Sequence, residues 1–460
     1  MYQDLSFMKV PLPEDILKLK IYGDYARAQK MIRYFLEEKD IPKALRKRLE
    51  IEQEVIGVMS GNEYPFTYDE ALEIMTSHLR DFKKEELDYL KEISAADWIY
   101  IEGEVHFQRR FYENLIKTRP DFAKRVIAEN PEDNKENNLN QRLLNENIHY
   151  MKEHGERTVH TRIRSTIKAK KEFEEVGRKV RVYLPIPKVY EQVSNVEIHA
   201  SSPEIAYIAP ADAPQRKVYF ETELKENQEF MVDYSFDYHV NYVELDPAKV
   251  SEEQPDFCLE EQAPHIVFTP YLKELRDELA GDETNPIILA RRFYDFVTTK
   301  VMYSFMREYF TIECIPEYCA INLKGDCGVQ ALLFITLCRM SGIPARWQSG
   351  LYATEYYTGC HDWAQFYVAP YGWVFADPSF GGSAWRAGEK ERWNYYFGNL
   401  DIFRMPANSE IQKEFMPEKK WLRIDPIDNQ RGEFEYEDHG LRFSQLEVSQ
   451  ELISMEDIEK

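Results

Sequence analysis

The spacing of hydrophobic residues changes along the chain and divides it into regions. From residue 11 to about 130, apolar side chains such as Ile32 and Phe35 recur every three or four positions, which is typical of amphipathic helices. Between residues 158 and 245 the period becomes two, as in 230–238, and Pro, Asn, Asp and Gly clusters separate the runs. This alternation predicts the strands of an antiparallel β-sandwich.

The remainder of the chain mixes both periods. Helices are predicted over 285–303 and 326–341, and strands over 346–376, an order that indicates an α+β domain. The asparagine-rich segment 130–147 at first lacks apolar periodicity and predicts a linker that enters a short helix. Aromatic side chains between Trp98 and Tyr112 are spaced as one buried helical stripe.

We therefore expect a multidomain α+β protein. Its parts are a helical domain over 1–150, a β-sandwich over 157–247, an α+β domain over 255–415 and a C-terminal extension over 420–460. The acidic stretch 425–433 in the extension does not have the ligand spacing of an EF-hand, so we interpret it as a turn.

Charge and composition exclude several classes of partner. The 460 residues include 58 Lys and Arg against 81 Asp and Glu, so the formal net charge is −23 and nucleic acid is not expected as a partner. Residues 1–20 contain no apolar stretch of signal-peptide length, and the longest apolar run, 331–338, is far shorter than the roughly 20 residues that cross a bilayer. We expect a cytoplasmic protein without membrane contact, whose six irregularly spaced cysteines are reduced.

One cysteine stands where a helix is expected to begin. Cys327 precedes an almost continuously apolar segment that ends before Gly342 and Pro344, so the segment predicts a buried helix with Cys327 in its first turn. The positive end of a helix dipole lowers the pKa of a thiol, and the thiolate is the nucleophilic form. Cys327 is therefore a candidate nucleophile, whereas Cys338 on the same helix is expected to be a core residue.

A predicted hairpin supplies a base and an orienting acid. His361 begins the alternating segment 361–368, and the returning strand is expected over 371–377. A hairpin centred on residue 369 places His361 directly opposite Asp377, where cross-strand side chains lie about 5 Å apart. Asp377 would orient the imidazole, and His361 would take the thiol proton and return it to a leaving group.

Five linked motifs resemble the core of the transglutaminase-like superfamily. In chain order they are Gly325-x-Cys327 with the helix that follows, the segment 342–346, His361-x-Trp363, Gly372-Trp373 and Asp377-Pro378. The resemblance covers roughly residues 266–405. It implies a papain-like cysteine-protease fold, a Cys327–His361–Asp377 catalytic triad and acyl transfer through a thioester. Relatives with this core include protein cross-linkers, peptidases and deglycosylating amidases.

Some positions depart from the family pattern. Asp362 replaces a small residue after the histidine and Gln365 replaces an acidic residue. We expect Asp362 on the strand face opposite His361, where it would tune the triad. Tyr303 and Trp363 are candidates for an oxyanion or substrate contact, and core packing is the competing role for Tyr303.

The sequence thus predicts a cysteine enzyme that acts on a peptide or protein-like amide and needs no metal or cofactor. Hydrolysis is expected over amine transfer, because transfer requires a second binding site that excludes water. One alternative is a non-catalytic binding or scaffolding protein on the same fold, with a protein partner recruited by the helical domain. A weaker alternative is a zinc site formed by Cys314, Cys319, Cys327 and the Cys360-His361 pair, whose spacing is not a standard zinc pattern.

Overall fold

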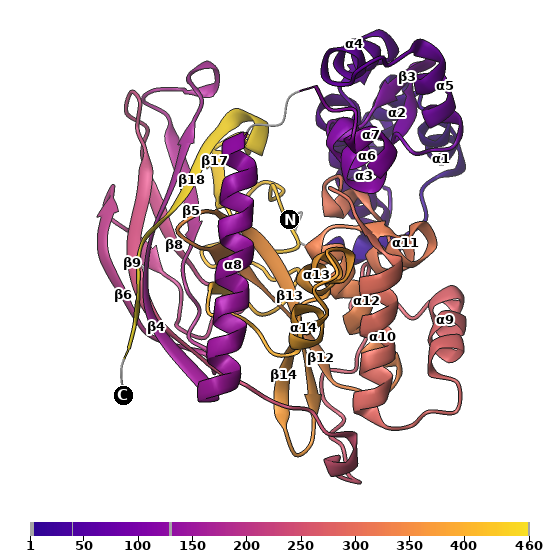
Figure 1. Cartoon of the computed structure of the whole chain (residues 1–460). Helices are drawn as coiled ribbons and strands as arrows, with labels where there is room; N and C mark the ends of the chain where they lie inside the picture. The colour runs from indigo at the N-terminus through magenta and orange to yellow at the C-terminus, as the bar shows by residue number, and fades with distance from the viewer. Residues whose placement is uncertain (1–3, 39, 128–130, 459–460) are drawn as a thin grey trace.

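The computed structural model describes residues 4–38, 40–127 and 131–458. Figure 1 shows a helical N-terminal region, a long separate helix, a β-sandwich and a central region of mixed helices and strands. The elements of the N-terminal region are η1 (Leu5–Lys9), α1 (Glu14–Ile21), α2 (Tyr25–Glu37), α3 (Lys43–Val58), η2 (Met59–Glu63), β1 (Phe66–Thr67), α4 (Tyr68–His78), α5 (Lys84–Glu92), β2 (Trp98–Ile101), β3 (Glu104–Phe107), α6 (Phe111–Thr118) and α7 (Pro120–Ala123).

The predicted helical stripe of aromatic residues from Trp98 onward is wrong. Strands β2 and β3 form a hairpin there, and Tyr100 is exposed. Glu102 and Gly103 have φ values of 51° and 88°. Because a helix cannot continue through this left-handed backbone, the segment turns back on itself.

The predicted short helix after a linker is instead the long helix α8 (Pro131–His154). Leu144, Ile148 and Met151 follow one another at spacings of three and four residues, and all are buried. Burial of this apolar face stabilises a helix whose asparagines have low intrinsic helix propensity. Asn130, the first residue of the predicted linker, lies outside the described residues.

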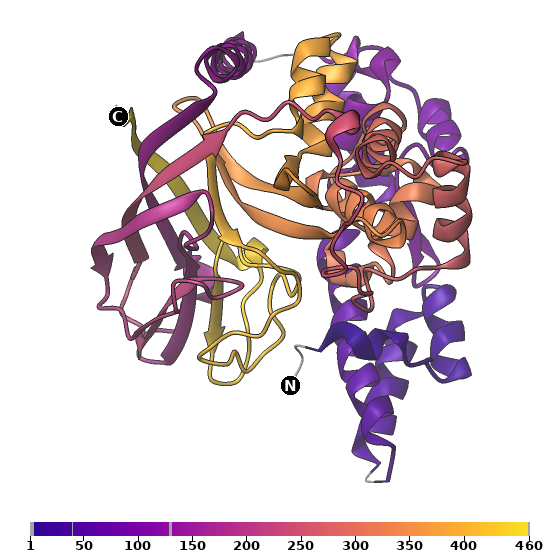
Figure 2. The same cartoon turned by 90° about the horizontal axis from the view of Figure 1, so that it is seen from below.

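The sandwich is built from two segments that are distant in sequence. Within the described residues its sheets have the strand orders β18-β4-β9-β6 and β17-β5-β8-β7. The strands are β4 (Glu156–Ala169), β5 (Lys179–Pro185), β6 (Val193–Ser202), β7 (Tyr207–Ile208), β8 (Lys217–Glu223), β9 (Phe230–Asn241), β17 (Glu433–Tyr436) and β18 (Leu446–Asp457), with η3 (Lys171–Phe173) and η6 (Phe443–Gln445) beside them. The C-terminal segment, which the sequence analysis treats as an extension, therefore supplies one strand to each sheet, as Figure 2 shows.

The mixed region contains the sheet β15-β14-β13-β12-β16 and the helices around it. Its elements are η4 (Pro247–Lys249), α9 (Pro270–Ala280), α10 (Pro286–Lys300), β10 (Met302–Tyr303), η5 (Tyr309–Thr311), α11 (Ile315–Asn322), β11 (Lys324–Gly325), α12 (Cys327–Met340), β12 (Ala345–Ala353), β13 (Thr358–Val368), β14 (Gly372–Ala376), α13 (Pro378–Arg386), α14 (Lys390–Tyr395), β15 (Phe397–Gly398) and β16 (Arg404–Asn408). The predicted helix over 326–341 and the predicted strands between 346 and 376 are confirmed.

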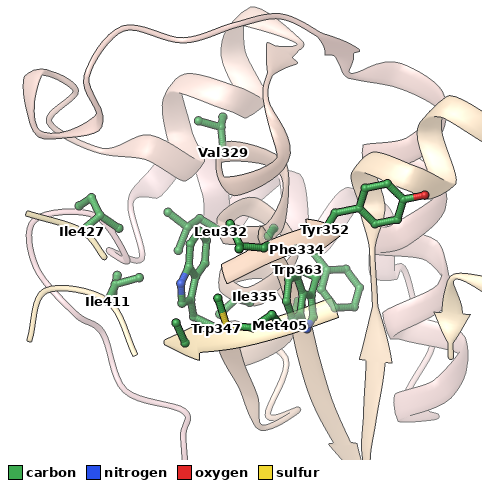
Figure 3. Packing of buried hydrophobic residues seen from close by; sticks show 14 of the residues in the cluster. Val329, Leu332, Phe334, Ile335, Trp347, Tyr352, Trp363, Met405, Ile411 and Ile427 are labelled. Atoms are coloured by element: carbon green, nitrogen blue, oxygen red, sulfur yellow. The ribbon is translucent and has the colours of Figure 1, made fainter. Parts of the chain in front are cut away.

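Helix α12 is the centre of this region. All its residues from Cys327 to Cys338 are buried, and it packs against α10, α11 and the sheet. Figure 3 shows side chains of α12 gathered in one cluster with Trp347, Trp363 and Met405 from three strands of the sheet. This packing fixes the start of α12 relative to β13.

Candidate active site

The N-terminus of α12 is held by polar contacts on both sides of Cys327. The side chain of Asp326 caps the helix by accepting the Val329 N–H at 3.3 Å, and it also accepts the hydroxyl of Tyr309. The Gln330 side chain donates to the Gly325 carbonyl at 2.8 Å. These contacts satisfy backbone groups that a helix leaves free at its start, and they fix Cys327 in the first turn, where it is 9% exposed.

Gly328 allows two other side chains to approach this turn. A Cβ at this position would lie 2.5 Å from the Tyr309 hydroxyl and 2.8 Å from Asp362 Oδ2. Any residue larger than glycine would therefore push Tyr309 and Asp362 away from the helix start.

The hydrogen-bond partner of the Cys327 thiol is Asp362. Cys327 Sγ donates to Asp362 Oδ2 at 3.2 Å, and Gln430 Nε2 donates to Oδ1 at 2.5 Å. Burial raises the pKa of the Cys327 thiol, and the carboxyl groups of Asp362 and Asp326 raise this pKa further. The predicted lowering of the thiol pKa by the helix dipole is therefore wrong, because burial and two adjacent acids outweigh the dipole.

His361 and Asp377 form a buried pair, as the sequence predicts. Their atoms Nε2 and Oδ2 are 2.7 Å apart. Arg404 Nη1 donates to the same Oδ2 at 2.9 Å, and Asp377 Oδ1 accepts the Phe380 N–H at 2.9 Å as the cap of α13. Asp377 is thus held by three groups besides its own backbone.

The register of the hairpin differs from the predicted one. Ala364 pairs with Ala376 and Val368 with Gly372, so the hairpin is centred on residue 370 instead of 369. Asp377 follows the last paired residue and lies diagonally across from His361. The two side chains still meet because a slip of two residues keeps them on the same face of the sheet.

The charges of this pair favour a neutral imidazole. Burial alone would raise the pKa of Asp377, but the positive charges of His361 and Arg404 lower it. Burial lowers the pKa of His361 in spite of the opposing effect of Asp377. With Nε2–H donating to Asp377, Nδ1 is the ring nitrogen that can accept a proton.

Cys327 and His361 open onto neighbouring cavities. Cys327 and Asp362 line a cavity of about 660 Å³, and His361 lines another of about 500 Å³. Tyr303, Tyr357 and Cys360 belong to the walls of both. No hydrogen bond joins Cys327 Sγ to the His361 ring in the described part of the chain.

The two predicted oxyanion or substrate contacts differ in position. Tyr303 is half-buried on β10, pairs with Gly325 and faces both cavities. Trp363 is fully buried, donates through Nε1 to Gln348 at 2.6 Å and stacks beside His361 with ring centroids 6.0 Å apart. Burial leaves Trp363 no surface for a substrate, so the predicted contact is wrong and this ring supports the imidazole.

The sequence analysis missed a group of acids around the thiol, of which Asp362 and Asp428 are buried and Asp326 and Asp425 are half-buried. Asp326, Asp362, Asp425 and Asp428 all line the cavity beside Cys327. Burial raises the pKa of Asp326 and of Asp425 to about 6 and that of Asp428 to about 7. The acidic stretch 425–433 was the available signal, but its sequence does not indicate which distant segment it contacts.

The described residues do not assemble a metal centre from His, Cys, Asp or Glu side chains. Cys314 and Cys319 belong to the start and middle of α11, and all six cysteines are free thiols. The zinc alternative therefore has no ligand set within the described ranges. None of the described helices is both long and apolar enough to span a bilayer.

Comparisons with known proteins identify one domain. The family model of the Transglutaminase-like superfamily matches residues 273–378. No curated protein matches the chain. Among solved structures, a candidate cysteine protease from Cytophaga hutchinsonii is similar at 14% identity with a TM-score of 0.39, over 66% of this chain and 98% of that chain. The periplasmic domain of TgpA from Pseudomonas aeruginosa is similar at 14% identity with a TM-score of 0.26, over 54% of this chain and 95% of that chain.

Proposed function

Because residues 273–378 form a transglutaminase-like domain, we propose that the chain is a cysteine enzyme that hydrolyses amide bonds. Cys327 is the nucleophile, His361 the general base and acid, and Asp377 the residue that orients His361. The observation that carries this proposal is the buried contact of 2.7 Å between His361 and Asp377, because His361 is the neighbour in β13 of Asp362, whose carboxyl group accepts the Cys327 thiol. This combination of a thiol, an imidazole and a carboxylate serves nucleophilic catalysis.

The reaction begins with a proton transfer. This mechanism requires the Cys327 side chain to leave Asp362 and bring its thiol to Nδ1 of His361, which takes the proton. The thiolate then attacks the amide carbonyl, and the imidazolium protonates the departing amine, which leaves a thioester on Cys327. Water, deprotonated by His361, cleaves the thioester, releases the acid and restores the thiol.

Labelling with a peptidyl vinyl sulfone, followed by mass mapping, tests this assignment. We expect the probe to modify Cys327 in the wild-type protein, and we expect the rate to fall by at least tenfold in His361→Ala and Asp377→Asn variants. Cys338 is the internal control, because it is fully buried within α12. Labelling of Cys327 at the same rate in all three proteins would refute the assigned roles of His361 and Asp377.

One observation favours the alternative of a non-catalytic platform. The thiol is paired with Asp362, and burial and the adjacent acids raise its pKa, which disfavours the thiolate at neutral pH. Incubation with a library of acylated dipeptides distinguishes the two functions. Products formed by the wild-type protein and absent with a folded Cys327→Ala variant would exclude the platform, and a library left intact by both proteins would favour it.

A further inference from the structure

The cavity beside His361 continues into a third cavity of about 340 Å³. The two share four wall residues, namely Asn140, Tyr303, Ser379 and Phe380. The Phe380 ring lies 4.6 Å from the His361 ring, centroid to centroid. A ligand that occupies the third cavity would therefore be continuous with the space in front of His361.

Three cationic side chains line this third cavity, which we call the cationic cavity. They are Lys117 from α6, Arg386 from α13 and Arg392 from α14. Helices α13 and α14 are consecutive in sequence, whereas α6 belongs to the N-terminal region, as the colours of Figure 1 show. The concentration of positive charge is notable in a chain whose net charge is −23.

Arg392 is buried, and none of the described carboxylates forms an ion pair with it. It is 4% exposed, and its Nη1 donates to the Gln141 carbonyl at 3.5 Å and to Asn145 Oδ1 at 3.2 Å. Both acceptors are neutral, and the described residues provide no hydrogen bond to Nε or Nη2. A buried guanidinium is ordinarily balanced by an anion, so this side chain is prepared to receive one.

The other two cations also have no ion pair among the described side chains. Arg386 donates to the Val301 carbonyl at 3.2 Å. Lys117 Nζ lies 5.2 Å from the centroid of the Tyr303 ring. Nearby acids are engaged elsewhere: Glu113 pairs with Arg110 and Glu391 with Lys152.

Neighbouring cations repel the charge of Lys117. Lys117 is exposed, but partial desolvation of its ammonium group lowers its pKa, and the positive charges of Arg110 and Arg386 lower this pKa further, while Glu113 opposes them. An anion placed between Lys117, Arg386 and Arg392 would relieve this repulsion.

We propose that the cationic cavity binds the carboxylate of the amine part of the substrate, so that the released product is an amino acid or short peptide with a free carboxylate. The proposal rests on the proposed function: because His361 protonates the departing amine, the amine part of the substrate must lie beside His361. A guanidinium binds a carboxylate through two parallel hydrogen bonds, and Arg392 has Nε and Nη2 available for them.

Calorimetric titration of the Cys327→Ala variant tests the site without turnover. The probes are N-acetylglycine, its uncharged methylamide and inorganic phosphate. We expect N-acetylglycine to bind, the methylamide to bind at least tenfold more weakly, and a further Arg392→Gln change to remove this preference. Equal binding of N-acetylglycine and the methylamide would overturn the proposal, and so would phosphate binding without carboxylate binding.

Two further variants complete the test, one as a control and one as a replacement for Arg392→Gln. Arg142→Gln removes an exposed arginine of α8 that pairs with Glu146 at 2.7 Å, and it should leave the preference for N-acetylglycine unchanged. If Arg392→Gln does not fold, Arg386→Gln is tested instead, because Arg386 is more exposed than Arg392. This substitution should weaken the binding of N-acetylglycine about tenfold, and unchanged binding would refute the site. Because no step needs catalysis, these results are separate from those of the vinyl sulfone experiment.

Discussion

The contact between Cys327 and Asp362 decides how reactive the thiol is. Asp362 lies next to His361 in sequence, yet it is Asp362 that reaches the sulfur. A carboxyl group in this position holds the proton on the thiol, because a second negative charge would be unfavourable in a buried site. In the proposed mechanism Asp362 would therefore restrain the thiol, and substrate binding would have to displace the thiol from Asp362.

We predict that Asp362→Asn increases the reactivity of Cys327. Removal of the adjacent acid lowers the thiol pKa, and each unit of lowering gives about a tenfold larger thiolate fraction at neutral pH. The rate of iodoacetamide modification at pH 7, measured by peptide mass mapping, should therefore rise about tenfold at Cys327. Cys338, which has no carboxyl among the causes of its raised pKa, should react as in the wild-type protein. An unchanged rate at Cys327 would contradict the restraint.

At the scale of the element, the start of α12 depends on glycine at position 328. We predict that Gly328→Ala lowers the free energy of unfolding by about 1–3 kcal/mol, because the new methyl group overlaps the Tyr309 hydroxyl and Asp362. Chemical denaturation measures the change.

Gly57 provides the matched control. It is also helical, in α3, and a Cβ there would have its nearest neighbour at 4.0 Å. Gly57→Ala should raise the free energy of unfolding by about 0.5–1 kcal/mol, the ordinary gain in helix propensity. Equal effects of the two substitutions would show that the space around Gly328 is less restricted than the distances indicate.

The elements around the site differ in how accurately the sequence predicts them. Helix α12 and strands β13 and β14 have strong local periodicity, so they are predictable. The register between β13 and β14 is less predictable from sequence, because the connection is a three-residue loop before Gly372, whose φ is 81°. Sequence does not distinguish this loop over 369–371 from one over 368–370, which would centre the hairpin on residue 369, so the predicted centre is one residue too early.

Other contacts depend on packing between distant segments. The raised thiol pKa arises where the start of α12, with Asp326, meets Asp362 of β13, and no local sequence pattern predicts that contact. Helix α8 is similar, since its length follows from burial of Leu144, Ile148 and Met151 and not from the propensity of its asparagines. The candidate residues Cys327, His361 and Asp377 could be selected from motifs, but the electrostatic state of their side chains could not be predicted.

At the scale of the whole molecule, the β-sandwich combines two segments of the chain, 156–241 and 433–457, which the mixed region separates in sequence. Strand β18 pairs with β4 from Leu446 opposite Ala169 to Asp457 opposite Val159, and β17 pairs with β5. The sandwich is therefore incomplete until the C-terminal segment is in place, and the segment that supplies Gln430 to Asp362 leads directly into β17.

We predict that Phe434→Ala in β17 destabilises the sandwich by about 3–5 kcal/mol, the usual cost of removing a buried phenylalanine ring. Phe434 is fully buried and its ring lies 5.6 Å from the Phe230 ring, centroid to centroid. Ile453→Ala on β18 is the control, because that side chain is 37% exposed, and it should cost less than half as much. Thermal unfolding followed by circular dichroism compares the two. A loss smaller for Phe434→Ala than for Ile453→Ala would mean that β17 is not part of the folded core.

The buried acids couple the stability of the whole molecule to pH. Burial raises the pKa of Asp428 to about 7 in the folded protein, whereas an unfolded aspartate titrates near 3.9. Between these values the folded state holds more protons than the unfolded state, so the contribution of Asp428 to stability is complete below about pH 4 and is lost as the pH rises toward 7. An asparagine mimics the protonated acid and does not titrate.

We therefore predict that the free energy of unfolding of the wild-type protein, minus that of Asp428→Asn, falls between pH 5 and 7 by up to about 1.4 kcal/mol per pH unit. Comparison with the variant removes the contributions of groups that do not interact with Asp428, including His361, whose lowered pKa has the opposite sign; Asp425 and Asp362 interact with Asp428 and contribute to the difference. Asp438→Asn is the control. Hydrogen bonds from Arg178 and His439 lower the pKa of Asp438 to about 2, so its effect is complete above about pH 5 and the corresponding difference should stay constant. Urea denaturation at several pH values measures both differences, and a constant difference for Asp428→Asn would show that this carboxyl is ionised in the folded protein throughout the range.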